Sequence, residues 1–214
     1  MLISFSGNNG SGKTHLSLFL YEKLSNKKGD VIYVKEFQYL FLDRIKKFLG
    51  NRTVKIQKEV IKKRNKNIVA YLLPYIVWFD YFVFFNLLTL FRRQKIIIVD
   101  RYTLDYLNTW IELGVSNKFI TFLYKLLPRS TMPYYIDVDP DVAFARFLQR
   151  ERERKSLGVS PKHNLNPDFY QRNREIYKRL LKENKYIIID GNQSLLICEK
   201  KVLSYYNKFT SMKK

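Results

Sequence analysis

A glycine-rich run near the start of the chain has the residue types and spacing needed to bind phosphate. It fits the pattern G-x-x-x-x-G-K-[S/T], and its members are Gly7, Asn8, Asn9, Gly10, Ser11, Gly12, Lys13 and Thr14. Glycines let the backbone curl so that its N–H groups point at phosphate oxygens. We expect Lys13 to reach the β- and γ-phosphates of ATP and the Thr14 hydroxyl to ligate Mg²⁺. The run therefore predicts a phosphate-binding loop.

The pair Asp100-Arg101 directly follows the apolar run Ile96 to Val99. A carboxylate at this place can hold Mg²⁺ or its water ligands, so Asp100 is the predicted metal partner of Thr14. The planar guanidinium of Arg101 matches a second phosphate and suggests a clamp on an acceptor. The alternative is an aspartate that caps a turn beside a solvent-exposed arginine.

Three arginines recur at four-residue spacing in the second half of the chain: Arg146, Arg150 and Arg154. On a helix they occupy roughly one face, where they could stabilise the charge that spreads over a transferred phosphoryl group. We expect them to belong to a lid at about residues 146–169. Because Glu151 and Glu153 alternate with the arginines, a salt-bridged surface helix is the alternative.

The elements that must position these residues follow an alternating order. Five short apolar runs have the character of buried parallel strands: Leu2 to Phe5, Val31 to Val34, Ile96 to Val99, Tyr134 to Val138 and Tyr186 to Ile189. Helical segments separate them, and the segment from Ser156 to Asn166 has the composition of a surface loop. The order predicts one α/β domain over residues 1–214, a five-stranded parallel sheet flanked by helices in three layers.

Polar residues follow each predicted strand, where the ligands of such sheets gather. They are Ser6-Gly7, Lys35-Glu36, Asp100-Arg101, Asp139 and Asp190-Gly191. Glu36 is a candidate to orient a magnesium-bound water or the acceptor. A lone charged residue at a strand end is as often only solvated.

The charge balance indicates an anionic partner. The 214 residues include 39 Lys and Arg against 19 Asp and Glu, a formal charge of +20. Such a surface attracts phosphorylated substrates, nucleic acid and anionic membranes alike, so charge alone does not choose among them. The single cysteine, Cys198, excludes an intramolecular disulfide and a cysteine-rich zinc site. A cytoplasmic location fits this composition.

The stretch from Ile68 to Phe91 is apolar and aromatic and is long enough to cross a bilayer. It contains Pro74, Asp80 and Asn86, and a carboxylate near the centre of a bilayer is costly. We expect a buried helix beside an acceptor pocket or at a subunit interface. Contact with a membrane surface and a true span remain alternatives.

With these positions in hand, the chain resembles the thymidylate kinase family over nearly its full length. The residues that carry the resemblance are Gly7 to Thr14, Glu36, Asp100-Arg101-Tyr102, Asp137 to Asp141 with Arg146, Asp168 to Tyr170 with Tyr177, and Asp190 to Gln193. The resemblance implies a P-loop kinase fold and Mg²⁺-dependent phosphoryl transfer from ATP to a nucleoside monophosphate, first of all dTMP. It also implies a homodimer and makes nucleic acid an unexpected partner.

The resemblance further assigns roles to single residues. It places Asn192 and Gln193 beside the adenine of ATP and gives the lid arginines a part in transfer. The acceptor is expected to contact Glu36, Phe37, Asp80, Tyr81, Arg101 and Asp105.

Several positions depart from the family pattern and leave the acceptor open. Phe37 follows Glu36 where the family has Pro-Gly-Gly-Thr, and Tyr81 replaces an arginine that helps to hold thymine. Asn108-Thr109-Trp110 stands in place of Ala-Tyr-Gln. The alternatives are a kinase of a nucleoside, sugar phosphate or lipid phosphate, and a nucleotide-dependent protein that binds nucleic acid or membrane.

Overall fold

The computed structural model describes residues 1–28, 30–35, 68–92, 95–156, 166–182 and 185–212. Five strands form one sheet in the order β2-β3-β1-β4-β5, and every neighbouring pair is parallel. Their bounds are β1 Leu2–Gly7, β2 Val31–Val34, β3 Ile96–Asp100, β4 Met132–Asp137 and β5 Ile187–Asp190. The predicted five-stranded parallel sheet is confirmed, although β4 begins two residues earlier than the sequence suggested.

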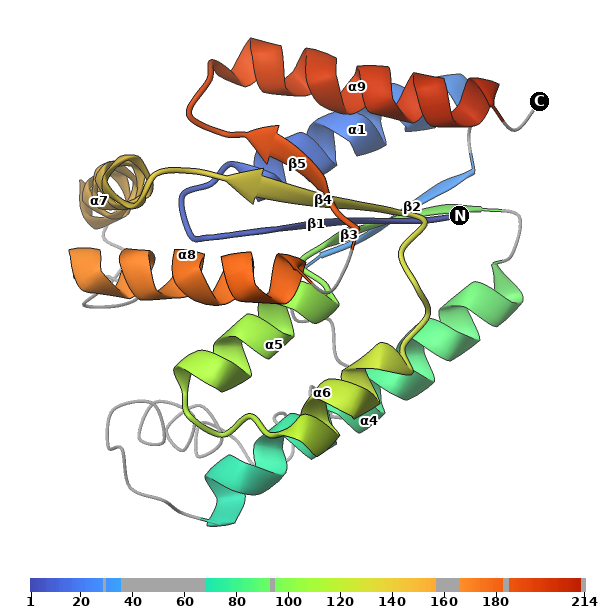
Figure 1. The fold of residues 1–214 in the computed structure, drawn as a ribbon. Helices are drawn as coiled ribbons and strands as arrows, with labels where there is room; N and C mark the ends of the chain where they lie inside the picture. Colours follow the sequence, from blue (N-terminus) through green and yellow to red (C-terminus); the bar gives the residue numbers. More distant parts are fainter. Residues whose placement is uncertain (29, 36–67, 93–94, 157–165, 183–184, 213–214) are drawn as a thin grey trace.

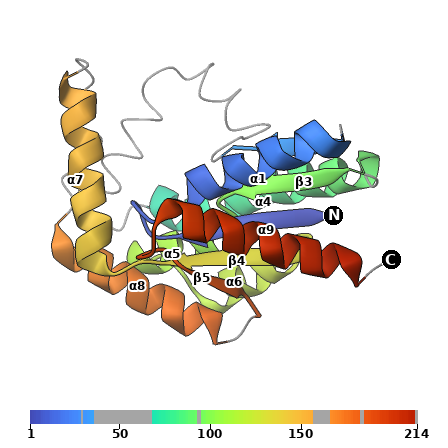
Figure 2. The same ribbon diagram turned by 90° about the horizontal axis from the view of Figure 1, so that it is seen from above.

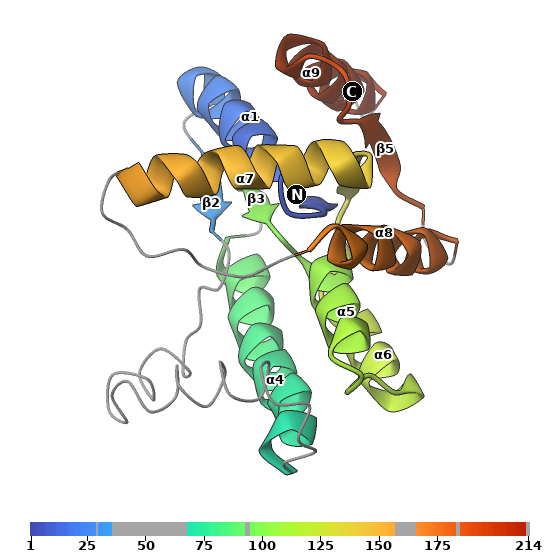
Figure 3. The same ribbon diagram turned by 90° about the vertical axis from the view of Figure 1, so that its left-hand side faces the viewer.

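Helices cover both faces of the sheet. They are α1 Lys13–Lys28, α4 Ile68–Phe91, α5 Thr103–Glu112, α6 Lys118–Lys125, α7 Pro140–Ser156, α8 Pro167–Leu181 and α9 Leu195–Ser211. Helices α1 and α9 lie on one face and α4, α5, α6 and α8 on the other, which gives the predicted three layers (Figures 1 and 2). Helix α7 runs across the carboxyl ends of the strands (Figure 3).

The core is divided between the two faces by the alternation of side chains along each strand. Ile3 and Phe5 point toward α1 and α9 and pack with Leu16 and Leu20. On β3, Val99 joins the cluster on the opposite face, beneath α4 and α5. Because adjacent residues in a strand point to opposite faces, β1 to β4 supply both layers of the core. On the edge strand β5, Ile189 is buried on one face and Ile188 is exposed on the other.

Helix α4 is buried along only one face. Val77, Tyr81 and Phe85 are at most 4% exposed and pack into the core. Phe79 on another side of the helix is 56% exposed. The segment Tyr71–Phe91 is long and apolar enough to cross a membrane, and 28% of its most apolar stretch is buried. The prediction of a helix is therefore confirmed, and the prediction that it is buried holds for one face.

Helix α8 begins at residues that favour a helix start, and one of its sides packs against the sheet. The Asn166 side chain accepts a hydrogen bond from the Phe169 N–H at 3.0 Å, and Pro167 occupies the first turn. Both residues favour a helix start. Further along, Tyr170 and Tyr177 are buried against the end of the sheet that carries the polar residues.

Candidate active site

The loop between β1 and α1 adopts a conformation that requires glycine. Gly10 and Gly12 have φ values of 79° and 88°, a region that other residues rarely adopt. A Cβ at Gly10 would also lie 2.3 Å from the carbonyl oxygen of Ala143 in α7. The loop thus curls as the sequence predicted, and it packs directly against α7.

Lys13 and Asn8 are held inside this loop. Lys13 is 4% exposed, and its ammonium donates to the Asn8 carbonyl at 3.1 Å. The Asn8 side chain donates to the Tyr170 carbonyl at 3.0 Å and accepts from the Asn9 N–H at 2.9 Å, which ties the loop to α8. The buried Ser11 hydroxyl has no hydrogen-bond partner among the described residues, so it is available to a ligand.

Thr14 and Asp100 meet at the edge where the loop approaches β3. The Thr14 hydroxyl donates to Asp100 Oδ2 at 2.7 Å. Asp100 is 1% exposed, and within the described part of the chain its Oδ1 has no hydrogen-bond partner. A buried carboxylate oxygen without a donor is costly unless a ligand satisfies it. These two oxygen ligands fit Mg²⁺, a hard cation.

Arg101 lies on the other side of the loop in a strained conformation. Its φ is 69°, and its guanidinium donates to Asn9 Oδ1 at 2.7 Å. A positive φ in a non-glycine residue is uncommon and clusters at functional sites. The structure therefore places the predicted clamp beside the phosphate-binding loop.

Asp105 holds the start of that loop. It is 3% exposed, and its Oδ1 accepts from the Gly7 N–H at 3.2 Å and from the Tyr177 hydroxyl at 2.9 Å. Its Oδ2 accepts from the Tyr102 N–H at 3.3 Å. Burial, followed by the charge of Asp105, raises the pKa of Tyr177, so the phenol stays a donor. The sequence assigned Asp105 to the acceptor, and these contacts give it a role in positioning Gly7.

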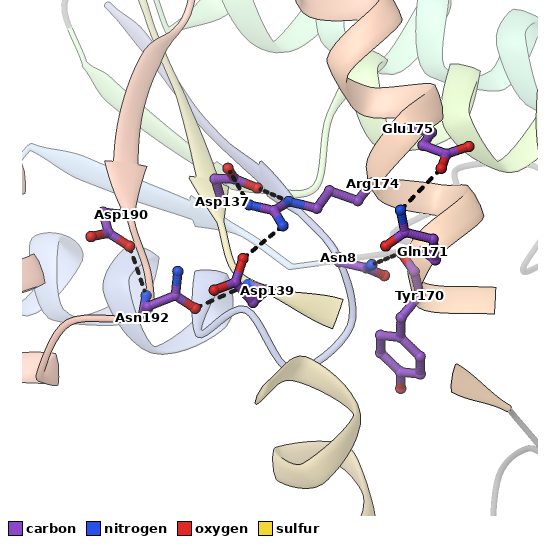
Figure 4. Close-up of polar contacts among 9 residues, drawn as sticks. All are labelled: Asn8, Asp137, Asp139, Tyr170, Gln171, Arg174, Glu175, Asp190 and Asn192. Carbon is purple, nitrogen blue, oxygen red and sulfur yellow. Dashed lines mark hydrogen bonds and ion pairs between the residues drawn. The ribbon is translucent and has the colours of Figure 1, made fainter. Parts of the chain in front are cut away.

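Arg174 is a residue that the sequence interpretation missed. Its guanidinium donates to both Asp137 oxygens, at 2.8 and 3.0 Å, and to Asp139 Oδ1 at 2.7 Å (Figure 4). Hydrogen bonding to Asp137 is the largest of the causes that raise the pKa of Arg174. The pairing fastens α8 to the carboxyl end of β4. In the sequence, the only sign of this pairing was the Asp-x-Asp spacing of Asp137 and Asp139, which belongs to a motif that carried the family resemblance.

The predicted adenine loop follows β5. Asn192 Oδ1 accepts from the Asp139 N–H at 3.0 Å, and the Asn192 N–H donates to Asp190 Oδ1 at 3.0 Å (Figure 4). Asn192 thus connects the loops that follow β4 and β5. Gln193 Oε1 is buried without a hydrogen-bond partner among the described residues. That these two residues contact adenine stays a prediction.

The three predicted lid arginines make different contacts along α7. Arg146 donates to the Gly191 carbonyl at 3.0 Å, which places it at the adenine loop. Arg150 lies 5.7 Å from the centre of the Phe147 ring, and Arg154 lies 3.7 Å from Glu151. The contact of Arg154 with Glu151 is of the kind expected for the alternative, a salt-bridged surface helix. The structure does not gather the three guanidinium groups at one point.

The predicted acceptor residues divide into two groups. Glu36 and Phe37 lie outside the described residues. Asp80 and Tyr81 are 2% and 4% exposed on the inner face of α4, and the Tyr81 and Tyr106 hydroxyls hydrogen-bond to each other. Tyr81 therefore belongs to a buried contact between α4 and α5.

Comparisons with known proteins identify the family of the chain. The model of the family described as thymidylate kinase matches residues 5–202. The chain is 24% identical to the thymidylate kinase of a Thermoanaerobacter species, over 97% of both chains. It is 26% identical to that of Acholeplasma laidlawii, over 91% of this chain and 92% of the relative. The crystal structure of thymidylate kinase from Ehrlichia chaffeensis superposes with a TM-score of 0.62 at 20% identity, over 97% of this chain and 98% of that one, and so shares the fold. The chain belongs to the thymidylate kinase family, a family of phosphotransferases.

Proposed function

We propose that this protein transfers the γ-phosphoryl group of ATP to dTMP and forms dTDP and ADP. The observation that carries the proposal is the hydrogen bond from the Thr14 hydroxyl to the buried Asp100 carboxylate, beside a loop that already holds Lys13. This arrangement provides donors and a metal site for a triphosphate. Arg101, on the other side of the loop, is suited to the phosphate of the second substrate.

The residues of the loop act on the donor. The N–H groups of the loop and Lys13 neutralise the triphosphate, and Lys13 can follow the γ-phosphoryl group through the transition state. Thr14 and Asp100 would hold Mg²⁺, which neutralises charge on the β- and γ-phosphates when bound. Asn192 and Gln193 are proposed to contact the adenine.

The acceptor supplies the nucleophile and needs no covalent enzyme intermediate. A phosphate oxygen of dTMP forms a bond to the γ-phosphorus while the bond from that phosphorus to the β–γ bridging oxygen breaks. The bridging oxygen leaves as part of ADP. Arg101 holds the acceptor phosphate, and its contact with Asn9 sets the direction of the guanidinium. Glu36, Phe37, Asp80, Tyr81 and Asp105 stay predicted contacts of the acceptor.

We also propose that residues 146–169 close over the substrates as a lid within a single domain of residues 1–214. Closure would exclude water and bring Arg146, Arg150 and Arg154 toward the phosphates. The support is that α7 already contacts the loop at Gly10 and the adenine loop at Gly191. A cytoplasmic location and a homodimer stay predictions, and the mass of the purified protein in solution tests the second.

One observation favours a different acceptor base. The family arginine that helps to hold thymine is replaced by Tyr81, which is engaged with Tyr106 in the core. Nucleoside monophosphates with each base, nucleosides, and sugar and lipid phosphates should therefore be compared as acceptors, with ATP, Mg²⁺ and ADP detection. Turnover with dTMP well above all others supports the proposal. A higher turnover with another acceptor would show that this member of the family uses a substrate other than dTMP.

A further inference from the structure

Helix α8 reaches both ends of the site proposed for ATP. Its Tyr177 hydroxyl donates to the Gly7 carbonyl at 3.2 Å, and its Tyr170 carbonyl accepts from the Asn8 side chain at 3.0 Å. These contacts fasten the helix to the phosphate-binding loop. Arg174 lies between the two tyrosines in sequence, and its side chain points to the carboxyl end of β4 instead (Figure 4). One helix therefore contacts both the loop for the phosphates and the segment beside the adenine loop.

The guanidinium of Arg174 binds two carboxylates at once. It donates to both oxygens of Asp137, at 2.8 and 3.0 Å, and to Asp139 Oδ1 at 2.7 Å. The Arg174 side chain is 19% exposed and that of Asp137 is 24% exposed, so water screens this pair only in part. A guanidinium presents its donors in a fixed plane, and these bonds therefore set the position and direction of both carboxylates. Without the cation, the two negative charges would repel each other.

The adenine loop is fastened to the segment that Arg174 holds. The Gly191 N–H donates to the Asp137 carbonyl at 2.7 Å, and Asn192 Oδ1 accepts from the Asp139 N–H at 3.0 Å (Figure 4). A Cβ at Gly191 would lie only 2.4 Å from a methyl group of the residue between the two aspartates, so the loop and the segment are in close contact. Closely packed groups pass displacements to one another. A shift of either aspartate would therefore move Asn192 as well.

We propose that Arg174 is a positioning residue for ATP, which holds Asp137 and Asp139 against α8 and thereby fixes the adenine loop relative to the phosphate-binding loop. In this role it acts through Asp139 and Asn192 and needs no contact with the nucleotide. A site whose two ends are already in place binds its ligand without the cost of ordering them. The inference rests on the proposed function, since it takes Asn192 and Gln193 as contacts of the adenine.

Two other roles of Arg174 lead to different expectations. If the residue only attracted the triphosphate by its charge, any other arginine of α8 would contribute as much. Its charge is already compensated by two carboxylates, which makes this role a weak one. If it only strengthened α8, its loss would loosen the phosphate-binding loop together with the adenine loop, because α8 contacts both. The positioning role instead predicts a loss of affinity that depends on the adenosine part of the ligand.

Calorimetric titration of the full-length protein, without an acceptor, separates these roles. The two probes are ATP and inorganic tripolyphosphate, each with Mg²⁺, and the second offers the phosphates without the adenosine. The test variant is Arg174→Met, which keeps much of the length of the side chain and loses its charge and donors. The matched control is Arg172→Met on the same helix, whose side chain is 55% exposed and lies 3.6 Å from Glu112. Both variants remove one positive charge.

A second variant, Asp139→Asn, changes the charge in the opposite direction. The Asp139 side chain is 54% exposed, so the fold should tolerate the substitution. It weakens the contact with Arg174 and makes the protein more positive. A general attraction between charges would therefore strengthen the binding of ATP, whereas the positioning role predicts weaker binding. This variant also decides the question if Arg174→Met does not fold, which thermal unfolding of each variant shows.

We expect Arg174→Met to raise the Kd of ATP about tenfold, the low end for a residue that orients a ligand-contacting group. The Kd of tripolyphosphate should stay close to that of the parent. Asp139→Asn should show a smaller loss of the same kind, and Arg172→Met should bind both probes like the parent.

Three results would overturn the proposal: ATP binding like that of the parent in Arg174→Met, equal losses for ATP and tripolyphosphate, or equal losses in Arg174→Met and Arg172→Met. A parent that binds tripolyphosphate but not ATP would overturn it together with the role of ATP as donor. A parent that binds ATP and shows the expected pattern, but forms no dTDP, would support the positioning role and contradict only the proposed acceptor.

Discussion

Replacing Asp105 by asparagine tests whether this residue positions the phosphate-binding loop or binds the acceptor. The substitution keeps the shape of the side chain but removes one acceptor oxygen and the charge. In the structure both carboxylate oxygens accept hydrogen bonds, from the Gly7 N–H, the Tyr177 hydroxyl and the Tyr102 N–H. In the asparagine variant the side-chain NH₂ group, itself a donor, would have to face one of these three donors.

The cost follows from burial, because Asp105 is only 3% exposed. A buried donor left without a partner costs about 1–3 kcal/mol, and the remaining bonds lose the charge that makes them about twice as strong as neutral ones. We therefore expect Asp105→Asn to lower the free energy of unfolding by about 3 kcal/mol. For a chain of this size that lowers Tm by roughly 6–12 °C.

The assay combines thermal unfolding with steady-state kinetics for each substrate. A positioning role at Gly7 predicts a higher KM for ATP and a lower kcat, because the loop carries the donors for the triphosphate. The control is Asp30→Asn, whose carboxylate is 67% exposed in its ion pair with Lys95 and should change stability little. An unchanged Tm with an effect only on the KM of the acceptor would refute the positioning role and restore the acceptor role.

Three further predictions rest on other parts of the structure. Arg101→Ala should raise the acceptor KM about 10- to 100-fold, since hydrogen bonds to charged groups are worth about 1.5–3 kcal/mol; a change confined to the KM of ATP would place Arg101 on the donor side. Gly10→Ala should weaken ATP binding and destabilise the fold more than Gly114→Ala. Both glycines have a positive φ, but only a Cβ at Gly10 would meet another residue, at 2.3 Å from the carbonyl oxygen of Ala143. Urea unfolding and ATP titration compare the two variants, and equal effects would contradict the close packing of α7 on the loop. Burial raises the pKa of Tyr186 from 10.0 to about 12. The contribution of the neutral phenol to the free energy of unfolding is therefore fully present below pH 10 and is lost as the pH rises through about 12. Urea midpoints that stay constant from about pH 9 to about pH 12 would show that this phenol ionises freely in the folded protein.

The parts of the site that the sequence predicted follow either from a local pattern or from the position of residues at the ends of strands. The glycine pattern fixes the loop from Gly7 to Thr14 locally, and strand ends place Asp100 and Arg101 at the same edge. The contacts that brace this edge join distant residues: Arg174 lies 37 positions from Asp137, and Tyr177 lies 170 positions from Gly7. No local pattern predicts such pairs.

Two differences between expectation and structure have simple physical causes. The sequence interpretation began β4 at Tyr134, where the run of aromatic and β-branched residues starts, and Pro133 before it cannot donate a sheet hydrogen bond. In the structure Pro133 lies beside β1 only, since the pairing with β5 begins at Tyr134. Helix α4 was expected to be buried because its apolar run contains Pro74, Asp80 and Asn86, which disfavour a membrane span. Composition alone does not say which side meets the core, and only the inner face does.

The most direct test of the central claim is the detection of dTDP after incubation of the purified protein with ATP, Mg²⁺ and dTMP. The products can be separated by anion-exchange chromatography, with Lys13→Ala as the matched variant. We predict dTDP and ADP in equal amounts, and a decrease of about 100-fold or more for Lys13→Ala, because the ammonium stabilises the transferred phosphoryl group. Absence of dTDP from a folded parent that binds ATP, or Lys13→Ala turnover within about threefold of the parent, would contradict the proposed function.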